Sequence, residues 1–165
     1  AEGTMLQDEA MCFMKIGLDI ERADCTARLL DSKYHVLLPA SEEVGGSLDY
    51  YQWGTLLRSL SAFRAYHKIY RDRISASRVA ELVILNAQMP RSLRCCYDRL
   101  TETLEDLCGT SAPECQRIAG KIHSGLRYRQ IGEVFDSGLH EFLTEFIEGN
   151  AQVGQQLARD FMMVR

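Results

Sequence analysis

Charged side chains follow one edge of a long apolar stretch near the start of the chain. Glu21, Asp24, Arg28 and Asp31 recur three or four residues apart, a spacing that brings side chains together on a helix. Asp24, Arg28 and Asp31 can form a solvated ladder of ion pairs. Glu21 and Arg28 lie one position from the apolar stripe, where a partly buried charge needs a partner. We therefore expect Glu21 to be less than half exposed and paired with an arginine, as either a structural lock or a binding site.

The four histidines offer little metal chemistry. His35, His67, His123 and His140 form no HExxH, ExxH or HxH pattern, and no cysteine pair forms CxxC, so we expect no metal site and no cofactor. His140 and Glu141 follow a Ser-Gly pair at the start of the last expected helix. A Glu there complements the helix dipole, so their roles are either purely local or those of general acid-base groups acting with Glu21.

Arginines gather at two expected turns, Arg71 with Arg73 and Arg91 with Arg94. The guanidinium group suits bidentate recognition of carboxylate or phosphate, so these groups are either an anion site or chance neighbours in a chain with 19 basic residues. The sequence has no Gly-rich phosphate loop and no GxSxG nucleophile motif. No self-sufficient active site is evident.

The elements that must position these residues are helices. Apolar residues repeat three and four apart from Phe13 to Leu37, which predicts a helix from about Gln7 or Asp8 to Pro39. Similar patterns and turn residues predict further helices at 50–70, 78–85, 91–108, 113–129 and 139–163, with a short element at 131–135. Gly149 and Gly154 suggest a break in the last helix. We expect a single all-α domain over residues 1–165, an antiparallel bundle of about five to seven helices.

Composition and charge argue against nucleic acid and membrane as partners of this chain. The 165-residue chain has a net charge of −4 and is 46% hydrophobic, which disfavours a nucleic-acid surface. No apolar run reaches the roughly 20 residues of a membrane helix. The acidic start does not resemble a secretory signal, so we expect a cytoplasmic protein with six reduced cysteines. Because the chain begins with Ala1, we expect it to be part of a longer polypeptide.

Several segments together resemble the bacterial alpha-E family, a predicted α-helical domain named for an E-R motif. They are GTMLQDEAMCF, IERADCTARLLDSKYHVLLP, QWGTLLRSLSAFRAYHKIY, VAELVILNAQMPRSLRCC and GLHEFLTEF. Glu21-Arg22 is the E-R pair of this resemblance, and Arg28, Arg91, His140 and Glu141 also match motif positions. The sequence departs from the family at Leu18-Asp19, where a Gly-Arg pair is common. The family protein is about twice as long, so the chain resembles its C-terminal half.

The resemblance also implies a functional setting. Family members are typically encoded beside circularly permuted ATP-grasp and transglutaminase-like proteins, a setting proposed to modify or ligate peptides. It implies a helical accessory module that docks an ATP-grasp ligase or presents its peptide. Two alternatives stay open. One is an enzyme that uses a Glu/His/Arg cluster on an anionic or peptide substrate. The other is a structural half-domain that packs against the rest of its polypeptide or forms a homo-oligomer.

Overall fold

The protein is all-α. The computed structural model describes the backbone of residues 2–37, 47–71 and 73–162, which form eight α-helices, a closing π-helical turn and connecting loops, with no strand. The predicted fold class is therefore confirmed. Within this part of the chain, no helix is both long and apolar enough to cross a bilayer.

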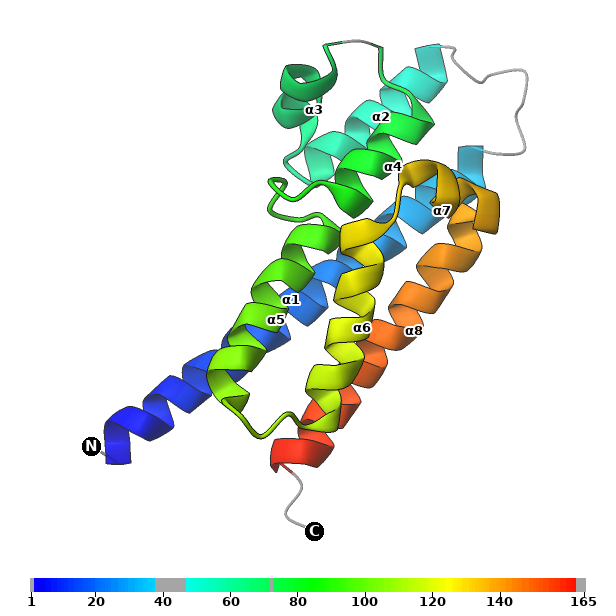
Figure 1. Cartoon of the computed structure of the whole chain (residues 1–165). Helices are drawn as coiled ribbons and strands as arrows, with labels where there is room; N and C mark the ends of the chain where they lie inside the picture. Colours follow the sequence, from blue (N-terminus) through cyan, green and yellow to red (C-terminus); the bar gives the residue numbers. More distant parts are fainter. Residues whose placement is uncertain (1, 38–46, 72, 163–165) are drawn as a thin grey trace.

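Four long helices form the body of the molecule (Figure 1). They are α1 (Glu2–Leu37), α5 (Leu93–Cys108), α6 (Glu114–Tyr128) and α8 (Leu139–Leu157). Helix α1 packs against α5 and α8, and α6 packs against the same two helices. Successive members run in opposite directions (Figure 1), as predicted for an antiparallel bundle.

Shorter helices cover one end of this bundle. Between α1 and α5 the chain forms α2 (Ser47–Ser59), α3 (Phe63–Tyr70) and α4 (Ala76–Leu85), between α6 and α8 it forms α7 (Ile131–Ser137), and η2 (Ala158–Met162) ends the described chain. The loop predicted at 40–49 lies mostly outside the described residues, although its last three residues already belong to α2.

The predicted apolar stripe builds α1. Ile16, Ala23, Ala27 and Leu30 are all fully buried, because residues three or four apart share one face of a helix. The helix begins at Glu2 rather than near Gln7. Its first turns extend past the end of α5 (Figure 1).

The helix predicted at 50–70 is in fact two helices. Ser61 adopts the left-handed conformation at φ 56°, and the amide of Ala62 donates to the carbonyl of Leu57 at 2.7 Å. This six-to-one hydrogen bond is the Schellman ending of a helix. The position usually carries glycine, so a serine there gave no sequence signal. The turn buries Tyr66, whose hydroxyl donates to the carbonyl of Arg73 at 2.9 Å.

Residue-specific caps set the other boundaries. Ser75 caps α4, accepting from the amide of Arg78 at 3.3 Å, and Gly109 ends α5 at φ 58°. Ser92, which accepts from the amide of Cys95 at 2.9 Å, starts α5 two residues later than expected. Helix α8 continues through Gly149, where an added Cβ would lie 3.1 Å from Cδ1 of Ile122. That glycine permits close approach of α6 and α8 instead of breaking the helix.

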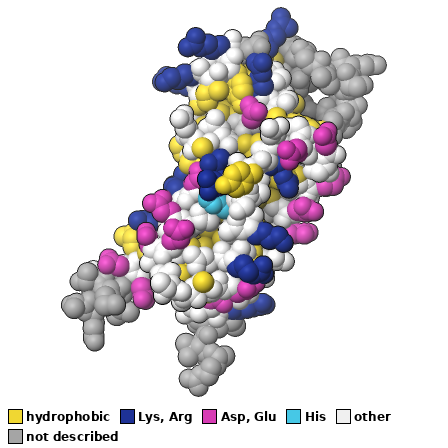
Figure 2. All heavy atoms as spheres, in the orientation of Figure 1, with side chains coloured by type: hydrophobic (Ala, Val, Ile, Leu, Met, Phe, Trp, Pro, Cys, Tyr) yellow, Lys and Arg dark blue, Asp and Glu magenta, His cyan; other side chains and the backbone are white. Residues whose placement is uncertain are grey.

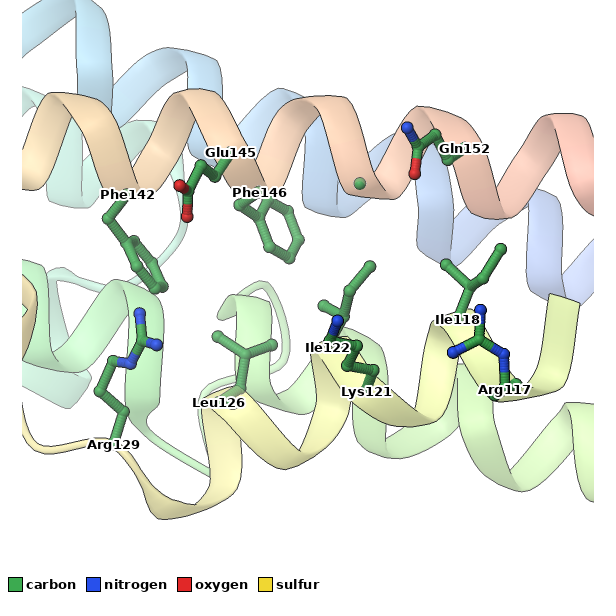
Figure 3. Close-up of a pocket in the computed structure, with 12 residues that line it drawn as sticks. Arg117, Ile118, Lys121, Ile122, Leu126, Arg129, Phe142, Glu145, Phe146 and Gln152 are labelled. Atoms are coloured by element: carbon green, nitrogen blue, oxygen red, sulfur yellow. The ribbon is translucent and has the colours of Figure 1, made fainter. Parts of the chain in front are cut away.

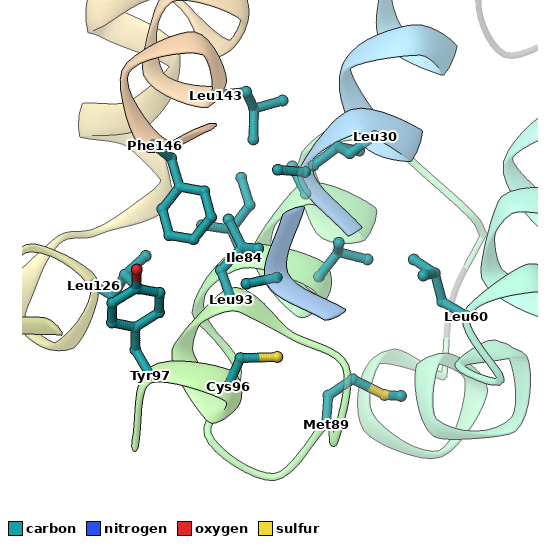
Figure 4. Close-up of a cluster of buried hydrophobic side chains, with 14 of the residues drawn as sticks. Leu30, Leu60, Ile84, Met89, Leu93, Cys96, Tyr97, Leu126, Leu143 and Phe146 are labelled. Atoms are coloured by element: carbon teal, nitrogen blue, oxygen red, sulfur yellow. The ribbon is translucent and has the colours of Figure 1, made fainter. Parts of the chain in front are cut away.

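The bundle interior includes aromatic packing, shown in Figure 4, and a buried polar link through Asn150. Tyr97 of α5 meets Phe146 of α8 edge to face, with ring centroids 5.5 Å apart. The Tyr97 hydroxyl donates to Oδ1 of Asn150 at 2.6 Å, and Nδ2 of Asn150 donates to the carbonyl of Ile20 at 2.9 Å. These two bonds join α5, α8 and α1 within the core.

Candidate functional site

The Glu21-Arg22 pair lies on the surface of α1. Both side chains are exposed. Within the described residues the Glu21 carboxylate makes no ion pair and no hydrogen bond, so the prediction that an arginine holds it is wrong. An exposed carboxylate with no partner contributes little to folding. The structural-lock interpretation of this pair therefore loses its physical basis.

Large apolar side chains lead along α1 to this pair. Met11, Met14 and Leu18 are 51%, 61% and 48% exposed, and Glu21 continues their alternating three- and four-residue spacing. That spacing places them on one narrow stripe of the helix. Single exposed apolar residues are ordinary, whereas these three share one side of the helix and form a contiguous exposed stripe.

A hollow of about 270 Å³ lies beside the pair, at the junction of α1 with the end of α2 and the start of α5. Its lining includes Glu21, Arg22 and Arg91 together with Leu18, Cys25, Thr26 and Leu60. The Thr26 hydroxyl donates to the carbonyl of Arg91 at 2.9 Å, and Nη1 of Arg91 donates to the carbonyl of Ser59 at 3.3 Å. These bonds hold the three segments together, so half of the predicted cluster is gathered on a fixed surface.

A second hollow, of about 350 Å³, continues from the first between α1 and α5. It is lined by Lys15, Leu18, Asp19, Arg22, Arg99, Glu102, Thr103 and Asp106. Leu18 and Arg22 line both hollows. We call this continuous surface, formed by the exposed stripe of Met11, Met14 and Leu18 and by the two hollows, the E-R face.

The floor of the second hollow carries an ion pair that the sequence did not reveal. Asp19 is only 4% exposed, and its Oδ1 accepts from both Nε and Nη2 of Arg99 at 3.0 Å. Burial raises the pKa of Asp19, although the hydrogen bond from Arg99 and the positive charges of Arg99 and Arg22 act in the opposite direction. Nη2 of Arg99 also donates to the carbonyl of Pro90 at 2.8 Å, so this arginine ties α1 to the turn before α5.

Two cysteines adjoin the same arginine. Nη1 of Arg99 lies 3.1 Å from Sγ of Cys95, and Nη2 lies 3.6 Å from Sγ of Cys96. Burial raises the pKa of Cys96 to about 11, so Cys96 is a protonated thiol at neutral pH and a poor nucleophile. All six cysteines are free in the structure.

The remaining candidate residues lie elsewhere. Arg28 pairs with Asp24 at 3.0 Å and its side chain is 64% exposed, which confirms that part of the solvated ladder. Asp31 instead pairs with Nδ1 of His140 at 2.7 Å. This hydrogen bond raises the pKa of His140. Glu141 folds over Gly138, which has φ 94° and leaves no room for a Cβ beneath the carboxylate.

These positions separate His140 and Glu141 from Glu21. Asp31, the partner of His140, is ten residues beyond Glu21 on the same helix, about 15 Å along its axis at 1.5 Å per residue. Hydrogen-bond reach is about 3 Å, so the expected acid-base cluster is not assembled. The side chain of His35 lies outside the described residues, and among the described ones no group of three or more metal-ligating side chains is present.

The sequence matches one family model over residues 1–162, described as "a predicted alpha-helical domain with a conserved ER motif". The chain belongs to the Alpha-E family. Glu21-Arg22, the exposed pair on α1, is the one Glu-Arg dipeptide in this Alpha-E sequence. Neither the curated proteins nor the solved structures that were compared match the chain.

Two contributors to the site were missed from the sequence. Asp19 lies three residues after Ile16 and four before Ala23, a spacing that already places it on the buried side of α1. A buried aspartate must find a cation, which was the available signal. Its partner Arg99 is 80 residues away, and nothing local in the sequence identifies it.

Proposed function

We propose that this Alpha-E chain is a non-catalytic partner module of a circularly permuted ATP-grasp ligase, docking the enzyme or presenting its peptide substrate. The observation that carries the proposal is the E-R face. Its charged pair is exposed and Glu21 has no partner among the described residues, and its apolar stripe lies open. The choice of an ATP-grasp ligase rests on the family's typical gene neighbours. An ATP-dependent partner also implies a cytoplasmic setting.

The E-R face has the size and composition of a docking surface. From Met11 to Cys25 the E-R face covers 14 residue steps, about 21 Å of helix, which suits one side of a standard interface of about 800 Å². The face combines exposed apolar side chains with charged ones, and docking surfaces carry both kinds. Arg22 and Arg91 are exposed, and arginine is enriched among residues that dominate binding energy.

A structural half-domain is the second candidate, because the same stripe suits another helix from a second copy or from the rest of a longer polypeptide. The two proposals differ in what covers the stripe. A partner module stays monomeric until the ligase is added, whereas an oligomerisation domain self-associates through Met14 and Leu18. Sedimentation equilibrium of the chain alone separates them.

Titration calorimetry with the ATP-grasp protein encoded beside the chain tests the leading proposal. Met14→Asp places a charge on the stripe without entering the core, and we expect it to weaken binding at least about tenfold. The matched control is Ile69→Asp, because Ile69 is also a large exposed apolar residue, 45% exposed on α3, and we expect its binding to match the parent. No association of the parent, or equal losses in both variants, would refute the proposal.

A further inference from the structure

A groove with an apolar floor runs between α6 and α8 (Figure 3). Its volume is about 450 Å³. Ile118, Ile122 and Leu126 of α6 face Phe142 and Phe146 of α8 along its length (Figure 3). Ile118 and Ile122 are partly exposed, whereas the other three are buried. The floor thus offers apolar surface to an incoming side chain.

Glycines keep the groove open. Gly125 lines it, and a Cβ built there would meet no atom within 4 Å. An ordinary side chain at 125 would project into this space, midway between Lys121 and Arg129. Gly149 lines the opposite wall, where its small size lets α8 approach Ile122. The missing side chain at Gly125 therefore leaves a notch in the surface of α6, and below this notch α6 and α8 pack closely.

The α6 rim is positively charged. Arg117, Lys121 and Arg129 line this side of the groove, four and eight residues apart, and Glu145 lines the α8 side. Arg117 is paired with Glu114, so Lys121 and Arg129 supply the positive charge of the rim. Arg129 stacks over the ring of Phe142 at 5.1 Å. Lys121 is exposed and, within the described residues, makes no ion pair. Lys and Arg side chains gather over α6 on the face in Figure 2, while Asp and Glu border α8.

We infer that this groove is a docking site for an acidic amphipathic helix of a partner protein. The apolar side of the partner helix lies on the groove floor, and the carboxylates of the partner helix face Lys121 and Arg129 along the α6 rim. The 12 residue steps from Arg117 to Arg129 span about 18 Å, the length of three helical turns, which suits the helix-in-groove mode of recognition. The charge difference between the two rims sets the side on which the acidic residues lie.

This groove is distinct from the E-R face. Its lining comes from α6 and α8 and from the segment just after α6, whereas the lining of the E-R face comes from α1, α5 and the end of α2. The two surfaces share no residue. The inference therefore stands whether or not the E-R face binds a ligase, and a chain with both surfaces can hold two partners at once.

Fluorescence anisotropy with a designed probe tests the groove on the full chain. The probe is a fluorescein-labelled 18-residue helical peptide with leucines at i, i+3, i+4 and i+7 and glutamates flanking them on one side. The comparison peptide replaces every glutamate by lysine. We expect the acidic peptide to bind at least about tenfold more tightly, and the difference to shrink as salt screens the rim charges.

Two glycine variants provide a matched pair. Gly125→Leu fills the notch, whereas Gly120→Leu adds the same side chain to α6 outside the groove. A Cβ at either position meets nothing within 4 Å, and leucine favours helix more than glycine does, so both variants should fold. We expect Gly125→Leu to weaken acidic-peptide binding at least about tenfold and Gly120→Leu to leave it unchanged. Lys121→Glu should reverse the preference toward the lysine peptide.

Other outcomes would overturn the inference. Equal affinity for both peptides, no binding of the acidic one, or the same loss in both glycine variants would each do so. Self-association of the chain that Gly125→Leu abolishes would show that a second copy occupies the groove. Glu21→Ala/Arg22→Ala should not change peptide binding, which separates failure here from failure of the E-R face.

Discussion

Asp19 and Glu21 are two residues apart on α1, and the helix assigns them opposite roles. Asp19 is 4% exposed and bound to Arg99. Glu21 is exposed and, among the described residues, has no ionic partner. A two-residue step turns a helix by about 200°, which carries a side chain from one side to the other. Whether a charged residue of α1 stabilises the fold therefore depends on whether its side chain lies on the buried side of the helix.

Other polar groups on the buried side of α1 also bond to neighbouring helices. The Ile20 carbonyl accepts from Asn150 of α8, and the Thr26 hydroxyl donates to Arg91 before α5. These bonds fix α1 against the bundle, so they maintain the geometry of the E-R face. Glu21, on the exposed side, makes no ion pair or hydrogen bond to another described residue. We therefore expect substitutions of buried polar residues to lower the free energy of unfolding strongly, and substitutions on the exposed side of α1 to lower it little.

The largest expected effect is at Asn150, which is 1% exposed. Asn150→Ala removes the partner of the Tyr97 hydroxyl and leaves a small cavity, so the free energy of unfolding should fall by about 2 to 4 kcal/mol. Tyr97→Phe retains the bond from Asn150 to Ile20 and should cost about 1 kcal/mol. Urea denaturation measures both. A loss below about 0.5 kcal/mol for Asn150→Ala would show that this link does not stabilise α1.

Asp19→Ala should lower the free energy of unfolding by about 1 to 2 kcal/mol. It removes the carboxylate that binds Arg99, but the Arg99 side chain, 35% exposed, regains water. A double-mutant cycle with Arg99→Ala isolates the pair. An interaction free energy near zero would contradict the assignment of Asp19 to the structural side.

The same residue has a defined pH dependence. Burial raises the pKa of Asp19 in the folded state, so the folded chain binds this proton more readily than the unfolded chain does. Its contribution to stability is therefore greatest below the unfolded pKa of about 3.9 and declines as pH rises through the folded pKa. The difference in unfolding free energy between the parent and Asp19→Asn should shift in favour of the parent as pH falls from 7 to 4. A shift in the opposite direction would contradict burial as the dominant influence.

The contribution of the His140–Asp31 contact to stability should change at a higher pH than that of Asp19. The hydrogen bond to Asp31 raises the pKa of His140, so its contribution is fully present below the unfolded pKa of about 6.5 and is lost as pH rises through the folded pKa. The stability difference between the parent and His140→Ala should be larger at pH 6 than at pH 9. An equal difference at both values would show that the histidine is not charged in this contact.

The fold class, the apolar stripe of α1 and several helix ends could be predicted because they depend on local spacing and caps. The break at Ser61 could not, because a left-handed serine lacks the glycine signal. The candidate site was only half predictable. Glu21, Arg22 and Arg91 do meet at one hollow, but the pairing of Asp19 with Arg99 depends on contact between residues 80 positions apart. Periodicity places a residue on a helix face and does not identify what faces it.

The smallest expected stability effect belongs to the E-R pair and tests the central claim most directly. For Glu21→Ala/Arg22→Ala, the free energy of unfolding from urea denaturation should stay within about 0.5 kcal/mol of the parent, while calorimetry with the ATP-grasp ligase proposed as its partner should show binding lost. That combination establishes the pair as a docking surface. A stability loss well above about 1 kcal/mol, with binding lost only in proportion to unfolded protein, would contradict the account and make the pair a structural lock.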